Sequence, residues 1–257
     1  MLLSDLLKSA ASGQARVPDS WRQGRTAYGG LTAALMLQAA RARAPDTPLR
    51  SALINFTGPV TGDPALSAAP LRAGRNVTTV EAKAALEGAC VGAGVFSFGQ
   101  SRESSVVQDA PAPDAGTPDS YPDFMPPDYA RFAPAFFSNF DVRLIEGDRP
   151  VSGSDRGYVR AWARHRDEAA RAGELGLLCL ADVLPPAAMP MLKSPGPVSS
   201  MSWLVNLLCA PETENGWFMV ESELTAAREG YSSQAMRIWN TDGRMIADGM
   251  QSIVVFA

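Results

Sequence analysis

Two adjacent glycines mark the place in this sequence where chemistry is easiest to locate. Gly29 and Gly30 come directly before residues 31–43, an alanine- and leucine-rich segment with the apolar spacing of a helix. The first backbone N–H groups of a helix have no partner within it and carry the positive end of its dipole, so they can stabilise negative charge on a carbonyl oxygen. Glycine also lets a ligand approach the backbone closely. A tight turn that only starts the helix would use the same two residues.

A glutamine on an apolar strand face is the second candidate. Gln251 lies in the predicted strand 244–256, where alternation places it on the same side as Ile253 and Val255. An amide on an apolar face must find hydrogen-bond partners, so Gln251 is a candidate for holding water or substrate, and a satisfied structural amide is the alternative.

The single histidine and the three cysteines exclude several mechanisms. A zinc site needs clustered ligands, but Cys90, Cys179 and Cys209 are far apart in the sequence, so we expect no metal. A Ser-His-Asp hydrolase would have to use His165, which lies in the charged run 163–167 and is expected to be exposed. No nucleophile elbow accompanies it. Scattered cysteines are typical of a reducing compartment.

Composition indicates an ordinary globular protein. Of 257 residues, 46% are hydrophobic and 19% charged, which argues against a disordered chain. The net charge is −4, so a basic footprint for nucleic acid is missing. The N-terminus lacks the basic start and apolar block of a signal peptide, and no uncharged apolar stretch is long enough to cross a bilayer. We therefore expect a cytoplasmic protein that binds neither nucleic acid nor membrane.

A proline-rich segment divides the chain into two similar parts. Prolines are so dense in residues 111–134 that neither a helix nor an interior strand can continue there. We interpret this segment as a surface linker between an N-terminal repeat, 1–110, and a C-terminal repeat, 135–257. The predicted helices cover 2–10, 31–43 and 174–184, and the predicted strands cover 49–57, 65–71, 76–86, 89–98, 137–145, 157–165, 200–208, 217–226, 232–239 and 244–256.

The two parts can be overlaid, which indicates an internal duplication. The turn glycines Gly88 and Gly243 differ by 155 positions, and the same offset brings Phe96 onto Gln251. With an offset of 156, Val80 falls on Met236. Each part then contains a helix followed by about four antiparallel strands. One such unit leaves its apolar sheet face only partly covered, so we expect the two copies to pack together. The predicted fold class is α+β, and the site at Gln251 has no polar counterpart in the first part.

These features resemble the double-hotdog acyl-CoA thioesterases, specifically the thioesterase II family. The likeness covers most of the chain outside the proline-rich segment. It rests on the order and spacing of several stretches: Tyr28-Gly29-Gly30, residues 55–59, 71–75, 80–82, 87–88, 96–98, 229–231, 242–244 and 250–252.

The resemblance implies hydrolysis of a fatty acyl-CoA to a free acid and CoA, without a metal or organic cofactor. The family positions and activates a water with an aspartate, a threonine and a glutamine from the second half. By the resemblance, Gln251 matches the glutamine, Thr225 the threonine, and Ser200 stands where the aspartate is expected. Three carboxylates close in sequence could replace it, namely Glu221, Glu223 and Asp248. Otherwise hydroxyl and amide groups alone orient the water, or the protein is a weak catalyst.

Further residues receive expected roles in the same way. Gly30 is expected to hold the oxyanion, with Tyr28 and Gly29 beside the substrate. Asn55 either faces the pocket or ends a strand, and Arg75 either contacts the CoA phosphates or is a solvated charge. A homodimer or a higher homo-oligomer is expected from the resemblance. Two alternatives keep the same fold: a non-catalytic acyl-CoA-binding protein, and an acyl-thioester hydratase, which needs a histidine or an acid at the helix start.

Overall fold

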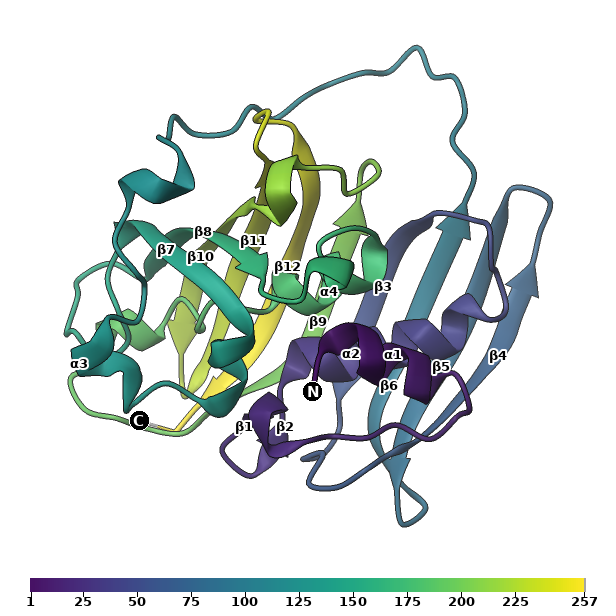
Figure 1. Cartoon of the computed structure of the whole chain (residues 1–257), viewed down its shortest axis with the longest axis horizontal. Coiled ribbons are helices and arrows are strands. Elements are labelled where there is room, and N and C mark those ends of the chain that lie inside the picture. The colour runs from purple at the N-terminus through teal and green to yellow at the C-terminus, as the bar shows by residue number, and fades with distance from the viewer. Residues whose placement is uncertain (257) are drawn as a thin grey trace.

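The computed structural model describes residues 1–256, which form one curved antiparallel sheet wrapped around helices (Figure 1). The sheet has ten strands in the order β4-β5-β6-β3-β9-β12-β11-β10-β8-β7. Its strands are β3 (Leu49–Phe56), β4 (Ala65–Ala73), β5 (Val77–Leu86), β6 (Ala89–Gly99), β7 (Phe140–Gly147), β8 (Tyr158–His165), β9 (Val198–Leu207), β10 (Phe218–Arg228), β11 (Tyr231–Asn240) and β12 (Met245–Val255). The double-hotdog α+β fold predicted from the sequence is confirmed.

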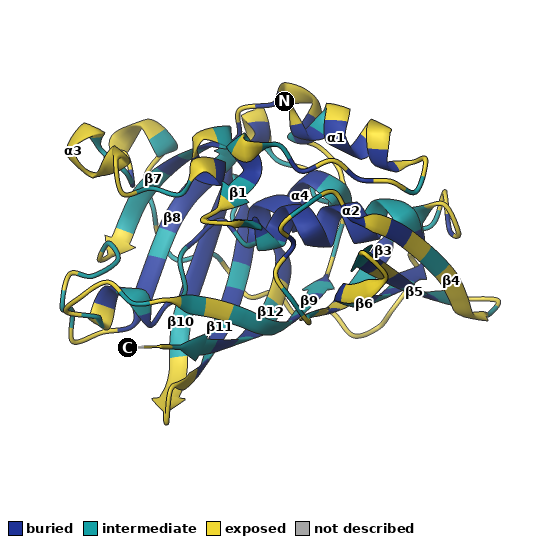
Figure 2. Cartoon of the chain, turned by 90° about the horizontal axis from the view of Figure 1, so that it is seen from below, coloured by how far each residue is buried: buried dark blue, intermediate teal, exposed yellow. Residues whose placement is uncertain are grey.

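The helices lie on one side of this sheet (Figure 2). They are α1 (Leu3–Ala10), α2 (Gly29–Arg41), the short α3 (Pro127–Ala130) and α4 (Glu174–Ala181), and a two-stranded hairpin, β1 (Arg22–Gln23) and β2 (Thr26–Ala27), precedes α2. Helix α2 precedes β3–β6 and α4 precedes β9–β12, so each half repeats the same order of elements. Among the described residues, no helix is long and apolar enough to span a membrane.

The two halves join where β3 pairs with β9, and their helices pack antiparallel above that junction. A β-carbon on Gly30 would lie 2.3 Å from the carbonyl oxygen of Cys179, so only glycine allows the start of α2 to approach α4 this closely. At the other end, Arg41 in the last turn of α2 pairs with Glu174 in the first turn of α4.

The residues in the hairpin turns set the register between neighbouring strands. Glu87 and Gly88 both have positive φ, as a two-residue hairpin between β5 and β6 requires, and Glu229 and Gly230 do the same between β10 and β11. The loop between β4 and β5 is two residues longer, because Ala73 pairs with Thr78 whereas Arg228 pairs with Tyr231.

This difference in loop length corrects the overlay of the two halves. Val80 pairs with Phe96, and Gln234 pairs with Gln251, so the counterpart of Val80 is Gln234 and not Met236. The match of Phe96 with Gln251 remains consistent with the register.

The expectation that His165 is exposed is wrong. Its side chain is only 1% exposed, and its Nε2 lies 2.9 Å from the carbonyl oxygen of Gly176. The charged run is the end of strand β8, in which alternate residues point to opposite faces, so Arg164 reaches Asp141 on the outer face while His165 points inward. Burial lowers the pKa of His165 to about 4, which keeps the ring neutral.

The proline-rich segment runs over the outer face of the second half and is attached to it. The indole N–H of Trp162 donates to the carbonyl oxygen of Gly116 in this segment, and that of Trp239 donates to Ala110 directly before it, each at 2.9 Å. Further along, Phe124 is fully buried. The segment therefore contributes to the core before β7 begins.

Candidate active site

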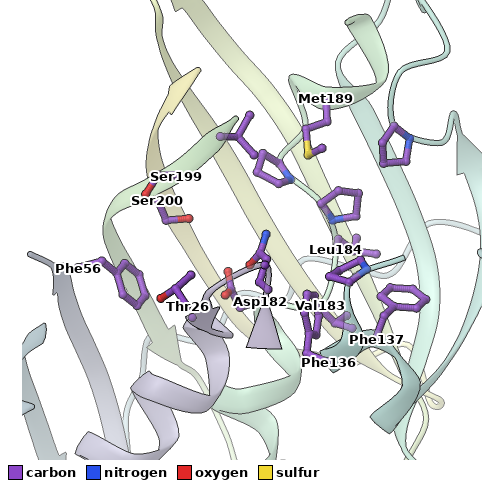
Figure 3. A pocket seen from close by; sticks show the side chains of 18 of the residues that line it. Thr26, Phe56, Phe136, Phe137, Asp182, Val183, Leu184, Met189, Ser199 and Ser200 are labelled. Atoms are coloured by element: carbon purple, nitrogen blue, oxygen red, sulfur yellow. The ribbon is translucent and has the colours of Figure 1, made fainter. Parts of the chain in front are cut away.

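A cavity of about 1070 Å³ opens beside the start of α2. Its walls are mostly apolar and aromatic, and a few polar groups converge on one wall (Figure 3). Apolar side chains in the lining include Phe56, Phe136, Phe137, Val183, Leu184 and Met189. A large apolar cavity with a few converging polar groups is the usual form of a ligand site.

Asp182 is the only carboxylate among the lining residues of this cavity in the described chain. It directly follows α4, which ends three residues earlier than the sequence predicted. Pro185 explains the early end, because a proline has no N–H and its ring clashes with the carbonyl of the residue four positions before it, here Ala181. The early end turns Asp182 out of the helix and towards the start of α2, where a β-carbon on Gly29 would lie 2.6 Å from Asp182 Oδ2.

The environment of Asp182 raises its pKa from the usual 3.8 to about 7. Desolvation is the main cause, since protein surrounds the carboxyl and only its cavity side is open. Hydrogen bonds from Gln251 and from the backbone of Gly30 favour the charged form and oppose this rise. A carboxylate with a pKa near neutrality can both accept and return a proton.

Two amide side chains connect Asp182 to the sheet. Gln251 donates through Nε2 to Asp182 Oδ1 at 2.9 Å and to Ser200 Oγ at 3.0 Å. Gln234 Nε2 donates to Gln251 Oε1 at 2.9 Å, and the backbone N–H of Ala187 donates to Gln234 Oε1 at 2.7 Å. Asp182, Gln251 and Ser200 thus form one hydrogen-bonded group at the cavity wall.

The structure brings four of the predicted site residues together. Gln251, Ser200 and Gly29 line the cavity, and Gly30 contacts Asp182 through its backbone. Tyr28 lies behind them: its hydroxyl donates to the carbonyl oxygen of Cys179 at 2.7 Å. The ring of Tyr28 stacks at 4.0 Å on that of Phe136, which lines the cavity.

The other predicted site residues lie elsewhere. Thr225 is exposed, where the pairing of β10 with β11 shifts register, and is not among the lining residues. Asn55 and Arg75 are also exposed and outside the lining.

The three carboxylates considered as substitutes for an aspartate do not reach the cavity either. Glu221 is bound by Arg160 and Arg237 on the outer face of the sheet. Glu223 joins the same ion-pair network through Arg237. Asp248 is exposed.

Asp182 is the residue that the sequence reasoning missed. It falls within the predicted helix 174–184, whose other residues from Leu177 to Leu184 are apolar. One carboxylate within an apolar run is the available signal, because a buried charge needs partners or a function. Within the described residues, no cluster of histidine, cysteine and acidic side chains could hold a metal ion.

Solved structures with the same architecture define the class as a hot dog fold. A conserved protein of unknown function with a hot dog fold from Alicyclobacillus acidocaldarius is 25% identical, with a TM-score of 0.85 over 95% of this chain and 92% of that one. A putative thioesterase II from Thermobifida fusca is 18% identical, with a TM-score of 0.78 over 95% and 92%. A TesB protein from Mycobacterium avium subspecies paratuberculosis is 17% identical, with a TM-score of 0.77 over 99% and 100%.

Family models match both halves of the chain. Residues 17–99 match the acyl-CoA thioesterase N-terminal domain, and residues 109–255 match the acyl-CoA thioesterase C-terminal domain. The chain therefore belongs to the acyl-CoA thioesterase family, as the sequence motifs predicted. A comparison with curated protein sequences gives no match.

Proposed function

We propose that this protein hydrolyses an acyl-CoA thioester to a free acid and CoA, with Asp182 as the general base. One observation carries the proposal: a carboxylate with a pKa near 7 faces a large apolar cavity and is hydrogen-bonded to Gln251. In this proposal Asp182 supplies the carboxylate whose expected absence motivated the binding-protein alternative.

Each side chain of the group has a distinct task in this reaction. Ionised Asp182 removes a proton from a water molecule as it attacks the thioester carbonyl carbon. Ser200 Oγ accepts from Gln251, so the hydroxyl hydrogen of Ser200 is available to the water or to the carbonyl oxygen. Both hydrogens of the Gln251 amide are used by Asp182 and Ser200, so Gln251 fixes these two groups instead of holding the water itself.

The tetrahedral intermediate then collapses. Its oxyanion lies at the start of α2, where Gly29 lines the cavity and the helix dipole favours negative charge. The C–S bond breaks, the CoA thiolate leaves, and protonated Asp182 returns its proton to the sulfur. The apolar part of the cavity, around Leu184, Phe136 and Met189, receives the acyl group.

Thiol release from a panel of acyl-CoAs tests the proposal. Asp182→Asn removes the base but keeps the shape of the side chain, so turnover should fall by about 10³-fold. Asp248→Asn is the matched control, since Asp248 is an exposed carboxylate on the same strand as Gln251. Equal turnover by wild type and Asp182→Asn would reject the mechanism. Saturable binding of acyl-CoA without release of thiol would instead identify a binding protein.

Assembly and location are part of the proposal as well. We propose a homodimer or a higher homo-oligomer, in accordance with the family resemblance, and a cytoplasmic location, in accordance with the scattered cysteines. Sedimentation of the purified protein tests the first of these, and a monomer at all concentrations would contradict it.

A further inference from the structure

Gln234 is a buried polar residue that none of the catalytic steps above requires. It lies on β11 directly across from Gln251 on β12, and only 1% of its surface is exposed. Neighbouring residues on the same strand face, Met236 and Ile238, are apolar and belong to the core. An amide in this environment is costly unless all its partners are supplied.

The orientation of the Gln234 side-chain amide is fixed by its hydrogen-bond partners. A backbone N–H can donate but not accept, so the contact of 2.7 Å from Ala187 N requires the side-chain oxygen of Gln234 at that position. The amide nitrogen of Gln234 then faces Gln251 and donates to its oxygen at 2.9 Å. Gln251 must consequently turn its own nitrogen towards Asp182 and Ser200.

The hydrogen bonds that join Asp182, Gln251, Gln234 and Ala187 form a closed loop together with the backbone between Asp182 and Ala187. Ala187 follows Asp182 by five residues, and the segment between them forms one wall of the cavity with Val183 and Leu184. Gln234 thus attaches the segment that carries Asp182 to the strand that carries Gln251. A single rotation of the Gln251 amide by 180° would break the bond to Gln234 and direct a carbonyl oxygen at the carboxylate of Asp182.

We propose that Gln234 is a positioning residue for this site, one that holds the Gln251 amide with both N–H groups directed at Asp182 and Ser200. The inference rests on the proposed function, because it concerns the same group of side chains. The role depends on hydrogen-bonding direction rather than on packing. The corresponding residue of the first half, Val80, lies beside Phe96 and has no such role.

Two substitutions separate direction from packing. Gln234→Leu keeps most of the volume but removes the donor, so the Gln251 amide is free to rotate. Gln234→Glu keeps the shape and the acceptor for Ala187, but its carboxylate presents an oxygen to Gln251 and favours the reversed amide. Ser232→Ala is the matched control, because Ser232 is buried on the same strand face and its hydroxyl has no hydrogen-bond partner among residues 1–256.

Two readouts are needed: kcat and KM for thiol release as functions of pH, and the ionisation of Asp182 followed by NMR of protein with ¹³C-labelled aspartate. The Asp182→Asn variant assigns the signal. Other titratable groups near Asp182 are Tyr28 and Cys179, and burial raises the pKa of both well above their usual values. A transition near pH 7 therefore belongs to Asp182.

The expected result is a change in kcat and in the pKa of Asp182, with little change in KM. We expect Gln234→Leu to lower kcat about tenfold. Gln234→Glu should lower kcat further and move the pH midpoint upward by about one unit, because Asp182 loses a donor and gains a negative neighbour. Ser232→Ala should keep the wild-type values.

The proposal is overturned if both Gln234 variants keep the wild-type pH midpoint and the wild-type NMR titration of Asp182, or if any loss of activity only follows the unfolded fraction measured by circular dichroism. The NMR titration also separates the two proposals. A wild-type protein that releases no thiol rejects the hydrolase, whereas the pKa of Asp182 in the variants still decides whether Gln234 positions Gln251.

Discussion

Helices α2 and α4 pack antiparallel, and the two ends of this pair occupy equivalent places in the fold but carry different polar groups. Where α2 begins and α4 ends, Gly29 and Asp182 face an open cavity. Where α2 ends and α4 begins, Arg41 and Glu174 form an ion pair, and Glu174 also accepts the backbone N–H of Leu49 at 2.6 Å. One end is thus available to a ligand, while the other satisfies its own charges.

The strands beneath the helices differ in the same way. Val80 and Phe96 pair on β5 and β6, and Gln234 and Gln251 pair at the corresponding place on β11 and β12. Both pairs are buried. The two halves have equivalent positions at this place, and only the amide pair of the second half provides a hydrogen bond to a carboxylate. The fold therefore supports the site but does not by itself create it.

Within this comparison of the strands, the largest expected effect comes from replacing the amide of Gln251 with an apolar side chain, as the first half has at Phe96. Gln251→Leu removes the donor to Asp182 and the link to Ser200, so kcat for thiol release should fall by about 10²-fold or more. Stability should change little or increase, because an apolar side chain fills the place of a buried amide. Thermal unfolding of the same preparation distinguishes lost chemistry from lost structure, and unchanged kcat would contradict the role of Gln251.

The pH dependence of Asp182 should follow from its raised pKa. Since the carboxylate must be ionised to accept a proton, kcat/KM should rise with pH through about 7. Stability should change in the opposite direction: the folded state binds its proton more tightly than the unfolded state, so this contribution is complete below about pH 4 and is lost as the pH rises through 7.

Thermal unfolding at pH 5 and pH 8 checks the sign of this linkage. Asp182→Asn should remove part of the loss in melting temperature that wild type shows at pH 8, while it lowers turnover by about 10³-fold. An Asp182→Asn protein that is less stable than wild type at pH 8 would contradict the assigned burial cost.

The opposite helix end should matter for stability alone. Glu174→Gln leaves the guanidinium of Arg41 without its charged partner, which should cost about 2–3 kcal/mol of the free energy of unfolding. Turnover per folded molecule should stay at the wild-type value. Denaturant unfolding combined with thiol release measures both, and a loss of kcat in fully folded protein would mean that the two helix ends are coupled.

The smallest effects distinguish the two hydroxyl candidates. Ser200→Ala should lower kcat about tenfold, because the hydroxyl beside Gln251 is lost. Thr225→Val should leave kcat unchanged within twofold, since Thr225 is exposed outside the cavity. A larger loss of kcat in Thr225→Val than in Ser200→Ala would instead assign the catalytic hydroxyl to Thr225.

The fold was predictable because its signals are local and repeated. Alternating strands, glycine-containing hairpins such as Glu87-Gly88, and the apolar helix after Gly30 each depend on neighbouring residues. Gln251 was predictable for the same reason, as an amide on an apolar strand face. His165 was not, because a charged run has the same composition whether it is a solvated loop or a strand with one buried side.

The sequence by itself determined the repeated architecture, the position of the glycines at the start of α2 and the presence of a buried glutamine on β12. Only the tertiary structure decided which carboxylate joins that glutamine. Asp182 and Gln251 are 69 positions apart, and their contact depends on where Pro185 ends α4 and on how closely Gly30 allows α2 and α4 to pack. Such contacts are set by the packing of whole elements against one another, which local sequence patterns do not encode.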